Sequence, residues 1–269
     1  GHKLTTNPAA YDLYLRARAV RDFVTATGSL LERVPQEIEL LSKAVALDPD
    51  FAMAHALLAE AHGLMYFIPE LDPTPERARL MKASVDAALR SGAGLPETRM
   101  AVGAYHFRVE QDYARALLEF KAAAESLPSD EWTFHWLGYT HRRLGQWPES
   151  RANFEKVILV NPRGPVGYFF LADTLHATRR YQEEQEILQR ALRFSPDLDN
   201  LLRRLAAARV ELDGDWATYL RSMQSLELPA EPRTRILVSF QLAVSARDFV
   251  RANAILQAAG NHGGLAVWH

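Results

Sequence analysis

Apolar side chains recur at spacings of three and four residues through the middle of the chain. Between residues 131 and 157 they occupy Phe134, Leu137, Trp147, Phe154 and Val157. The same spacings return 34 residues later, at Tyr168, Leu171, Tyr181, Leu188 and Ala191. Spacings of three and four place apolar side chains on one face of a helix. The pattern therefore predicts two amphipathic helices in each 34-residue repeat.

Prolines recur at the same interval of 34 residues, at Pro128, Pro162 and Pro196. A proline cannot continue a helix interior, so each one is expected to close a repeat. A small residue, Gly138 or Ala172, stands midway along the first helix of each repeat. We expect it to let the partner helix approach closely.

This pattern resembles the tetratricopeptide repeat family, whose 34-residue helix-turn-helix reads W-x2-L-G-x2-Y, then A-x3-F, then P. The resemblance extends beyond the two middle repeats, since Ala116, Phe120, Ala123 and Pro128 close an earlier one. It implies an all-α, right-handed superhelical solenoid of about six to seven helix pairs over residues 3–260. The expected repeats are residues 8–49, 50–94, 95–128, 129–162, 163–196, 197–229 and 230–260. Residues 261–269 would then form a tail or begin a further helix.

One array is expected rather than two domains. A lone helix pair cannot bury its apolar face, whereas stacked pairs share a continuous core. No linker rich in glycine and serine, or in proline, interrupts the series.

The family resemblance also implies a binding surface, because the first helix of each repeat lines a concave groove in this family. Carried over residue by residue, the groove is expected to contain Trp132, His135, Tyr139, Arg142, Arg143, Phe169, Asp173, His176, Arg108 and Arg203. Four of these are expected to lie off the packed face of their helix: His135, Tyr139, Arg142 and Arg143. The neighbouring framework positions are expected to pack between helices: Leu137, Gly138, His141 and Trp147.

The composition of this predicted groove favours a protein or peptide partner. Tyrosine, tryptophan and arginine dominate interface hot spots, and arginine favours acidic groups. The alternative is that these side chains form ordinary solvated helix faces. Family members that clamp the carboxylate of chaperone C-termini need lysine and asparagine where this chain has His135 and Tyr139. That class of partner is therefore not expected.

The rest of the composition gives no sign of catalysis, a cofactor or a metal. The chain has 269 residues, no cysteine and a net charge of −2, so thiolate chemistry is excluded and direct nucleic-acid binding is not expected. None of the common nucleotide-binding, metalloprotease or nucleophile-elbow motifs occurs. No apolar run is long enough for a membrane span. We expect a non-enzymatic protein in the cytoplasm, with the periplasm as the alternative.

The positions of the histidines bear on metal binding and on sensitivity to pH. His55 and His62 lie seven residues apart, about 10 Å along a helix, which is too far for one zinc ion. His62, His106 and His141 recur near equivalent places in successive repeats. If they are buried and neutral, protonation would destabilise the array.

The two ends of the chain bear on its context. We interpret Gly1 and His2 as the remnant of a cleaved tag, so we expect a piece of a longer protein. Residues 5–20, TTNPAAYDLYLRARAV, resemble the entry of repeat arrays in bacterial multidomain regulators. This implies a sensory or recruitment part of such a regulator. The alternative is self-assembly into a homodimer, through the apolar end LAVWH at residues 265–269 or the irregular terminal repeats.

Overall fold

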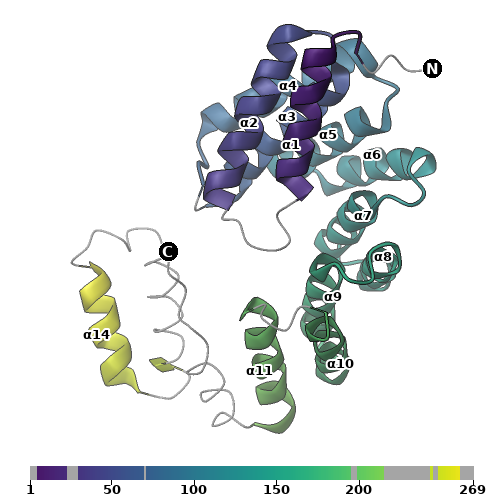
Figure 1. The fold of residues 1–269 in the computed structure, drawn as a ribbon. Helices are drawn as coiled ribbons and strands as arrows, with labels where there is room; N and C mark the ends of the chain where they lie inside the picture. The colour runs from purple at the N-terminus through teal and green to yellow at the C-terminus, as the bar shows by residue number, and fades with distance from the viewer. Residues whose placement is uncertain are drawn as a thin grey trace. The chain divides into compact units, whose positions relative to one another are not determined.

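The chain is helical throughout the part that the structure describes (Figure 1). The computed structural model describes residues 5–22, 30–69, 71–194, 199–214, 243–244 and 248–260. Within them every regular element is a helix, which confirms the all-α prediction. The chain divides into two compact units, Gly1–Phe170 and Leu171–His269.

The first unit consists of helices that pack in consecutive pairs. These pairs are α1 (Pro8–Asp22) with α2 (Leu30–Leu47), α3 (Ala52–Phe67) with α4 (Pro75–Gly92), α5 (Pro96–Tyr105) with α6 (Tyr113–Ser126), and α7 (Glu131–Arg143) with α8 (Trp147–Val160). A π-helical turn, η2 (His106–Glu110), extends α5 and also contacts α3 and α6. Each pair packs on the next, through α2 with α3, α3 with α5, and α6 with α7. Stacking of this kind lets the pairs share apolar faces that no single pair can bury.

The helices begin where the sequence supplies a start signal. Proline stands in the first turn of α4, α5 and α8, where a missing backbone N–H costs nothing. Asp112 caps α6 by accepting from the backbone N–H of Arg115 at 2.9 Å. Asp130 caps α7 by accepting from the backbone N–H of Thr133 at 2.7 Å. Each cap satisfies an N–H that the helix leaves without a partner.

In two of the helix pairs of the first unit, a glycine of the first helix lets the second helix approach closely. Phe120 of α6 and Phe154 of α8 are fully buried. A Cβ at Gly138 would lie 2.9 Å from the Cε1 and Cζ atoms of Phe154. The same place in the preceding repeat is Gly103, where a Cβ would lie 2.6 Å from Cε1 of Phe120. Gly138 thus allows the close approach that the sequence predicts.

The second unit receives the end of α9 (Pro165–Ala177), a helix that begins in the first unit. It also contains α10 (Tyr181–Leu192), α11 (Asp199–Asp213) and α14 (Phe249–Gly260). α10 packs against α11. Trp216 and most of the residues expected to form the sixth and seventh repeats lie outside the described residues. Whether the repeats form one array with the expected boundaries stays a prediction. No helix in the described part is both long and apolar enough to cross a membrane.

Candidate functional site

Aromatic side chains from α7, α8 and α9 meet beside one face of α7. Rings stand at positions three and four apart on α7, so the helix directs them to the same side. The His135 ring lies 5.9 Å from that of Tyr139, and the Phe170 ring lies 4.6 Å from His135 and 5.6 Å from Tyr139. Trp132 adds a ring 5.5 Å from His135. We call these four residues the ring cluster: Trp132, His135, Tyr139 and Phe170.

Arginines lie against the faces of these rings. The Arg142 guanidinium stands 4.7 Å from the centre of the Tyr139 ring and 5.8 Å from that of Phe170. The Arg143 guanidinium stands 5.7 Å from Tyr139. Cations within about 6 Å of an aromatic face are attracted by the ring quadrupole. The arginines are therefore held beside the rings rather than extended freely into solvent.

The outer side of the ring cluster remains open to solvent. Trp132 keeps 37% of its surface exposed, Arg143 is exposed, and Tyr139 and Arg142 are half-buried. Phe169 is half-buried as well, with its ring perpendicular to that of Phe170 at 5.3 Å. These predicted groove residues come together in the first unit.

His135 does not lie off the packed face, so that expectation from the sequence is wrong. The side chain is buried, with 8% of the residue exposed. Phe154 of α8 and Phe170 of α9 both approach its ring, at 6.1 Å and 4.6 Å, and cover it. Burial, reinforced by Arg108 and Arg142, lowers the pKa of His135 to about 3. The ring is therefore neutral, and its position suits it to support the exposed rings rather than to contact a partner.

Arg108 is also buried, although the sequence places it in the groove. Its residue is 8% exposed, and its Nη1 donates to the carbonyl oxygen of Glu60 at 3.1 Å. Its guanidinium lies 4.8 Å from the centre of the Trp136 ring. The reason is local, because Arg108 stands in the π-helical turn η2, which contacts α3. Burial lowers the pKa of Arg108 to about 10.

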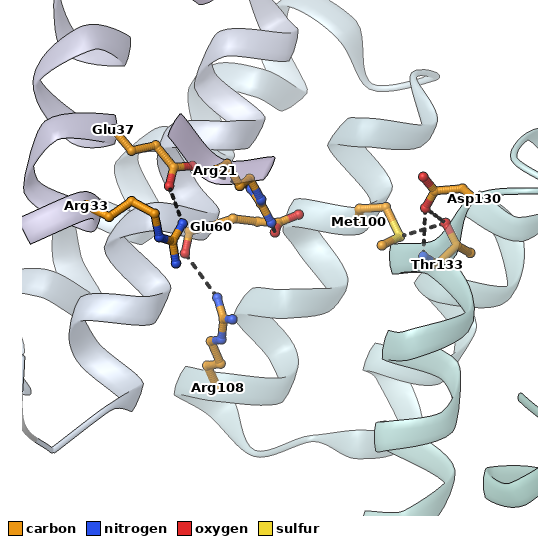
Figure 2. Close-up of polar contacts among 8 residues, drawn as sticks. All are labelled: Arg21, Arg33, Glu37, Glu60, Met100, Arg108, Asp130 and Thr133. Atoms are coloured by element: carbon orange, nitrogen blue, oxygen red, sulfur yellow. Dashed lines mark hydrogen bonds and ion pairs between the residues drawn. The ribbon is translucent and has the colours of Figure 1, made fainter. Parts of the chain in front are cut away.

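A buried network of charged side chains joins α1, α2 and α3 in the same unit, as Figure 2 shows. Arg21 pairs with Glu60 and lies 3.7 Å from Glu37, and Arg33 lies 3.4 Å from Glu37. Arg21 also stands 5.6 Å from the centre of the Trp132 ring. The sequence pattern did not predict this network. The sequence contains one indication of it: Glu37 occupies the position at which the repeat pattern has alanine.

The remaining predicted groove residues belong to the second unit. Asp173 forms an ion pair with Arg204, and the imidazole Nδ1 of His176 lies 2.9 Å from the carboxylate of Glu184. The side chain of Arg203 lies outside the described residues. The role of Asp173, His176 and Arg203 in partner binding stays a prediction.

Within the described residues, no three histidine, aspartate or glutamate side chains cluster as metal ligands would. Of the two histidines spaced seven apart, His55 contacts the carbonyl oxygen of Pro49 at 2.9 Å. The Nδ1 atom of His62 lies 3.3 Å from Arg77.

Known proteins resemble this chain in structure and not in sequence. No family profile and no curated protein matches it. PilW, a widely conserved type IV pilus biogenesis factor, is 14% identical, with 87% of this chain and 100% of PilW covered and a TM-score of 0.64. A tetratricopeptide repeat protein from Parabacteroides merdae is 14% identical, with 97% and 95% covered and a TM-score of 0.60. A thermophilic repeat protein of Thermus thermophilus is 15% identical, with 75% and 100% covered and a TM-score of 0.59. These likenesses confirm the tetratricopeptide-repeat fold that the 34-residue period predicts.

Proposed function

We propose that this tetratricopeptide-repeat chain binds a protein or peptide through the open side of the ring cluster, and that it performs no catalysis of its own. One observation carries the proposal: two arginines, Arg142 and Arg143, lie against the single ring of Tyr139 beside a partly exposed Trp132. Tryptophan, tyrosine and arginine are the residue types that contribute most to protein interfaces. The buried His135 beneath them holds the rings in place.

The arginines favour a partner with acidic groups. Arg143 is exposed and forms no ion pair with any described residue. An incoming carboxylate would meet two guanidinium groups whose orientation the Tyr139 ring already restricts. Restriction before binding lowers the entropy that binding must overcome. An acidic peptide or an acidic protein surface is therefore the partner we propose.

In its wider setting we propose that the chain recruits this partner for a larger bacterial regulatory protein in the cytoplasm. The support is the resemblance of residues 5–20 to the entry of repeat arrays in such regulators. Helix α1 begins within that stretch, at Pro8, and Asn7 caps it by accepting from the backbone N–H groups of Ala9 and Ala10.

The double variant Tyr139→Ala with Arg142→Glu tests the binding surface. It removes the central ring and reverses one charge, so capture of an acidic peptide from a peptide array should weaken about 30-fold or more. Arg79→Glu is the matched charge control, because Arg79 is an exposed arginine on α4. Circular dichroism should show unchanged helix content in both variants. Equal binding by the double variant and by the control would contradict the proposed surface.

Self-assembly is the second candidate function, and α14 supplies an observation in its favour. Phe249 and Val250 are the first two residues of this helix, with 64% and 84% of their surfaces exposed. Adjacent exposed apolar side chains often mark a protein contact. The other predicted contact, residues 265–269, lies outside the described residues.

Light scattering coupled to size exclusion tests this candidate. If α14 mediates a homodimer, Phe249→Ser with Val250→Ser should convert a dimer to a monomer. Leu118→Ser is the control, because Leu118 is an equally exposed apolar residue on α6. A wild-type chain that stays monomeric at high micromolar concentration would remove self-assembly from consideration.

A further inference from the structure

A side chain of α1 contacts a side chain of α7, three helix pairs further along the chain. The Arg21 guanidinium, in the last turn of α1, lies 5.6 Å from the centre of the Trp132 ring, in the first turn of α7. In repeat arrays each repeat usually contacts only its neighbours. α1 packs along α2, whereas α7 packs along α6 and α8. The contact between Arg21 and Trp132 therefore joins helix pairs that are not neighbours in the array.

Arg21 keeps charged partners whether or not Trp132 lies beside it. It pairs with Glu60 of α3 and lies 3.7 Å from Glu37 of α2. Figure 2 shows its side chain beside those of both glutamates. A buried charge is costly only when its partners are removed. Separation of Arg21 from Trp132 would leave these ion pairs in place, so it would cost only the contact with the ring.

That contact is partly exposed to solvent. Trp132 keeps 37% of its surface exposed, and a cation attracts an aromatic ring less strongly at an exposed site than at a buried one. The other arginine that lies on a tryptophan of α7 is different, since Arg108 and Trp136 are 8% and 4% exposed and the guanidinium is 4.8 Å from the ring centre. Of the two contacts, that of Arg21 should open more readily.

The helix pair of α1 and α2 is also less constrained than the pairs that follow it. In the structure it packs on one neighbour, through α2 with α3, whereas the pair of α3 and α4 packs on a neighbour at each side. The position of the first pair therefore depends on one helix interface and on the contacts that Arg21 makes with α3 and α7.

We propose that Arg21 and Trp132 form a latch, which holds the first helix pair toward the fourth and covers one face of the Trp132 ring. A partner that packs on this face must displace Arg21, so α1 competes with the partner for Trp132. The affinity for the partner is then reduced by the fraction of molecules in which the latch is open. The competition rests on the proposed function, whereas the latch itself does not.

A distance measurement without any ligand tests the latch. The chain has no cysteine, so Ala19→Cys on α1 and Ala152→Cys on α8, both at exposed positions, can carry two spin labels. Double electron–electron resonance should give a narrow distance distribution in the labelled parent chain. Arg21→Gln with Glu60→Gln removes the cation, keeps the net charge and leaves two amides that can hydrogen-bond to each other. Its distribution should be broader and extend to longer distances.

The control carries the same two substitutions in an exposed ion pair of α4, Arg79→Gln with Glu76→Gln, and should keep the parent distribution. Trp132→Leu is the second variant, because it removes the ring and leaves the buried network intact. It should broaden the distribution as well, and it decides the test if circular dichroism shows that the Arg21 and Glu60 variant does not fold. A parent distribution in the folded variants would overturn the latch.

Calorimetric titration with poly-L-glutamate, an acidic probe, tests the competition at constant ionic strength. Opening of the latch by Arg21→Gln with Glu60→Gln should raise the affinity about threefold or more over that of the parent chain. An affinity that is unchanged or lower would overturn the competition, and a lower affinity would mean that Arg21 itself contacts the probe. Failure of the proposed function gives a different result, since Tyr139→Ala with Arg142→Glu would then bind poly-L-glutamate as the parent does.

Discussion

Lowering the pH from 8 to 5 is expected to destabilise the first unit by roughly 4 kcal/mol, through two buried histidines. Burial, reinforced by Arg77, lowers the pKa of His62 to about 4. Burial, reinforced by Arg108 and Arg142, lowers that of His135 to about 3. An unfolded histidine has a pKa of about 6.5, so the unfolded chain takes up protons that the folded chain refuses.

The difference between the folded and unfolded pKa values sets the direction in which pH changes the stability. Both folded pKa values lie below the unfolded value, so the stability is complete above about pH 6.5 and is lost as the pH falls toward the folded values. At pH 5 the unfolded state is almost fully protonated at each site and the folded state is not, which costs about 2 kcal/mol for each histidine. Against a typical total of about 5–15 kcal/mol, this is a large fraction.

Urea unfolding at pH 8 and pH 5, followed by tryptophan fluorescence, measures the effect. His62→Gln and His135→Gln should each reduce the difference between the two pH values by about 2 kcal/mol, and the double variant should remove most of it. A wild-type chain equally stable at both pH values would refute the prediction. So would a double variant with the full pH dependence of the wild type.

The sequence hypothesis about pH named three histidines, of which the structure buries His62 and His141 and leaves His106 half-buried. His62 is buried beside Arg77. His106 and His141 instead form side-chain hydrogen bonds, with Glu110 at 2.7 Å and Gln146 at 2.6 Å. Equivalent places in successive repeats therefore have different polar neighbours. The repeat period predicts which face a histidine occupies and does not predict what it contacts.

The 34-residue period was sufficient to predict the fold, because the fold repeats the same helix pair. Apolar residues three and four apart define each helix. The proline defines where a repeat ends, and the small residue defines where two helices approach each other. Gly138 illustrates this, since its place midway along α7 predicted the contact with a partner helix that Phe154 makes. Each such contact is local to one repeat or to its neighbour, so a 34-residue pattern contains the information that specifies it.

The candidate site was harder to predict, because it depends on contacts between repeats. His135 is buried because Phe170 arrives from the following repeat, and no spacing within α7 reveals that ring. Arg108 is buried because a π-helical turn directs it toward α3, and the three- and four-residue spacing of ordinary helices does not anticipate such a turn. Trp132 stayed partly exposed, as its place in the repeat implies.

The second large effect concerns Gly103 and Gly138, at which the two helices of a pair approach each other. Gly103→Ala and Gly138→Ala each place a Cβ within 3.0 Å of a buried phenylalanine ring, closer than folded proteins tolerate. Neither ring can move aside freely, because Phe120 is stacked on Trp136 at 5.1 Å and Phe154 on Phe170 at 5.6 Å. Overpacking of this kind costs typically about 1–3 kcal/mol.

Helix propensity opposes that cost, so the difference between the two effects decides whether a variant gains or loses unfolding free energy. Alanine is favoured over glycine in a helix by about 1 kcal/mol. Overpacking outweighs this gain, so each single variant should lose about 1–2 kcal/mol of unfolding free energy. Gly94→Ala is a control for an added methyl group without overpacking, because Gly94 lies in the turn after α4 and a Cβ there meets nothing within 4 Å, so its unfolding free energy should stay nearly unchanged. Urea unfolding should separate the control from both variants.

If Gly138→Ala proves as stable as the wild type or more stable, overpacking between α7 and α8 at Gly138 does not outweigh helix propensity, and the prediction is wrong. Adding Phe154→Leu to Gly138→Ala should recover part of the loss, because the smaller side chain leaves room for the new methyl group. Phe154→Leu alone should destabilise the chain, since it leaves a cavity beside an unsubstituted glycine. The two substitutions together should therefore cost less than the sum of their separate costs, which is the signature of direct contact between the two positions.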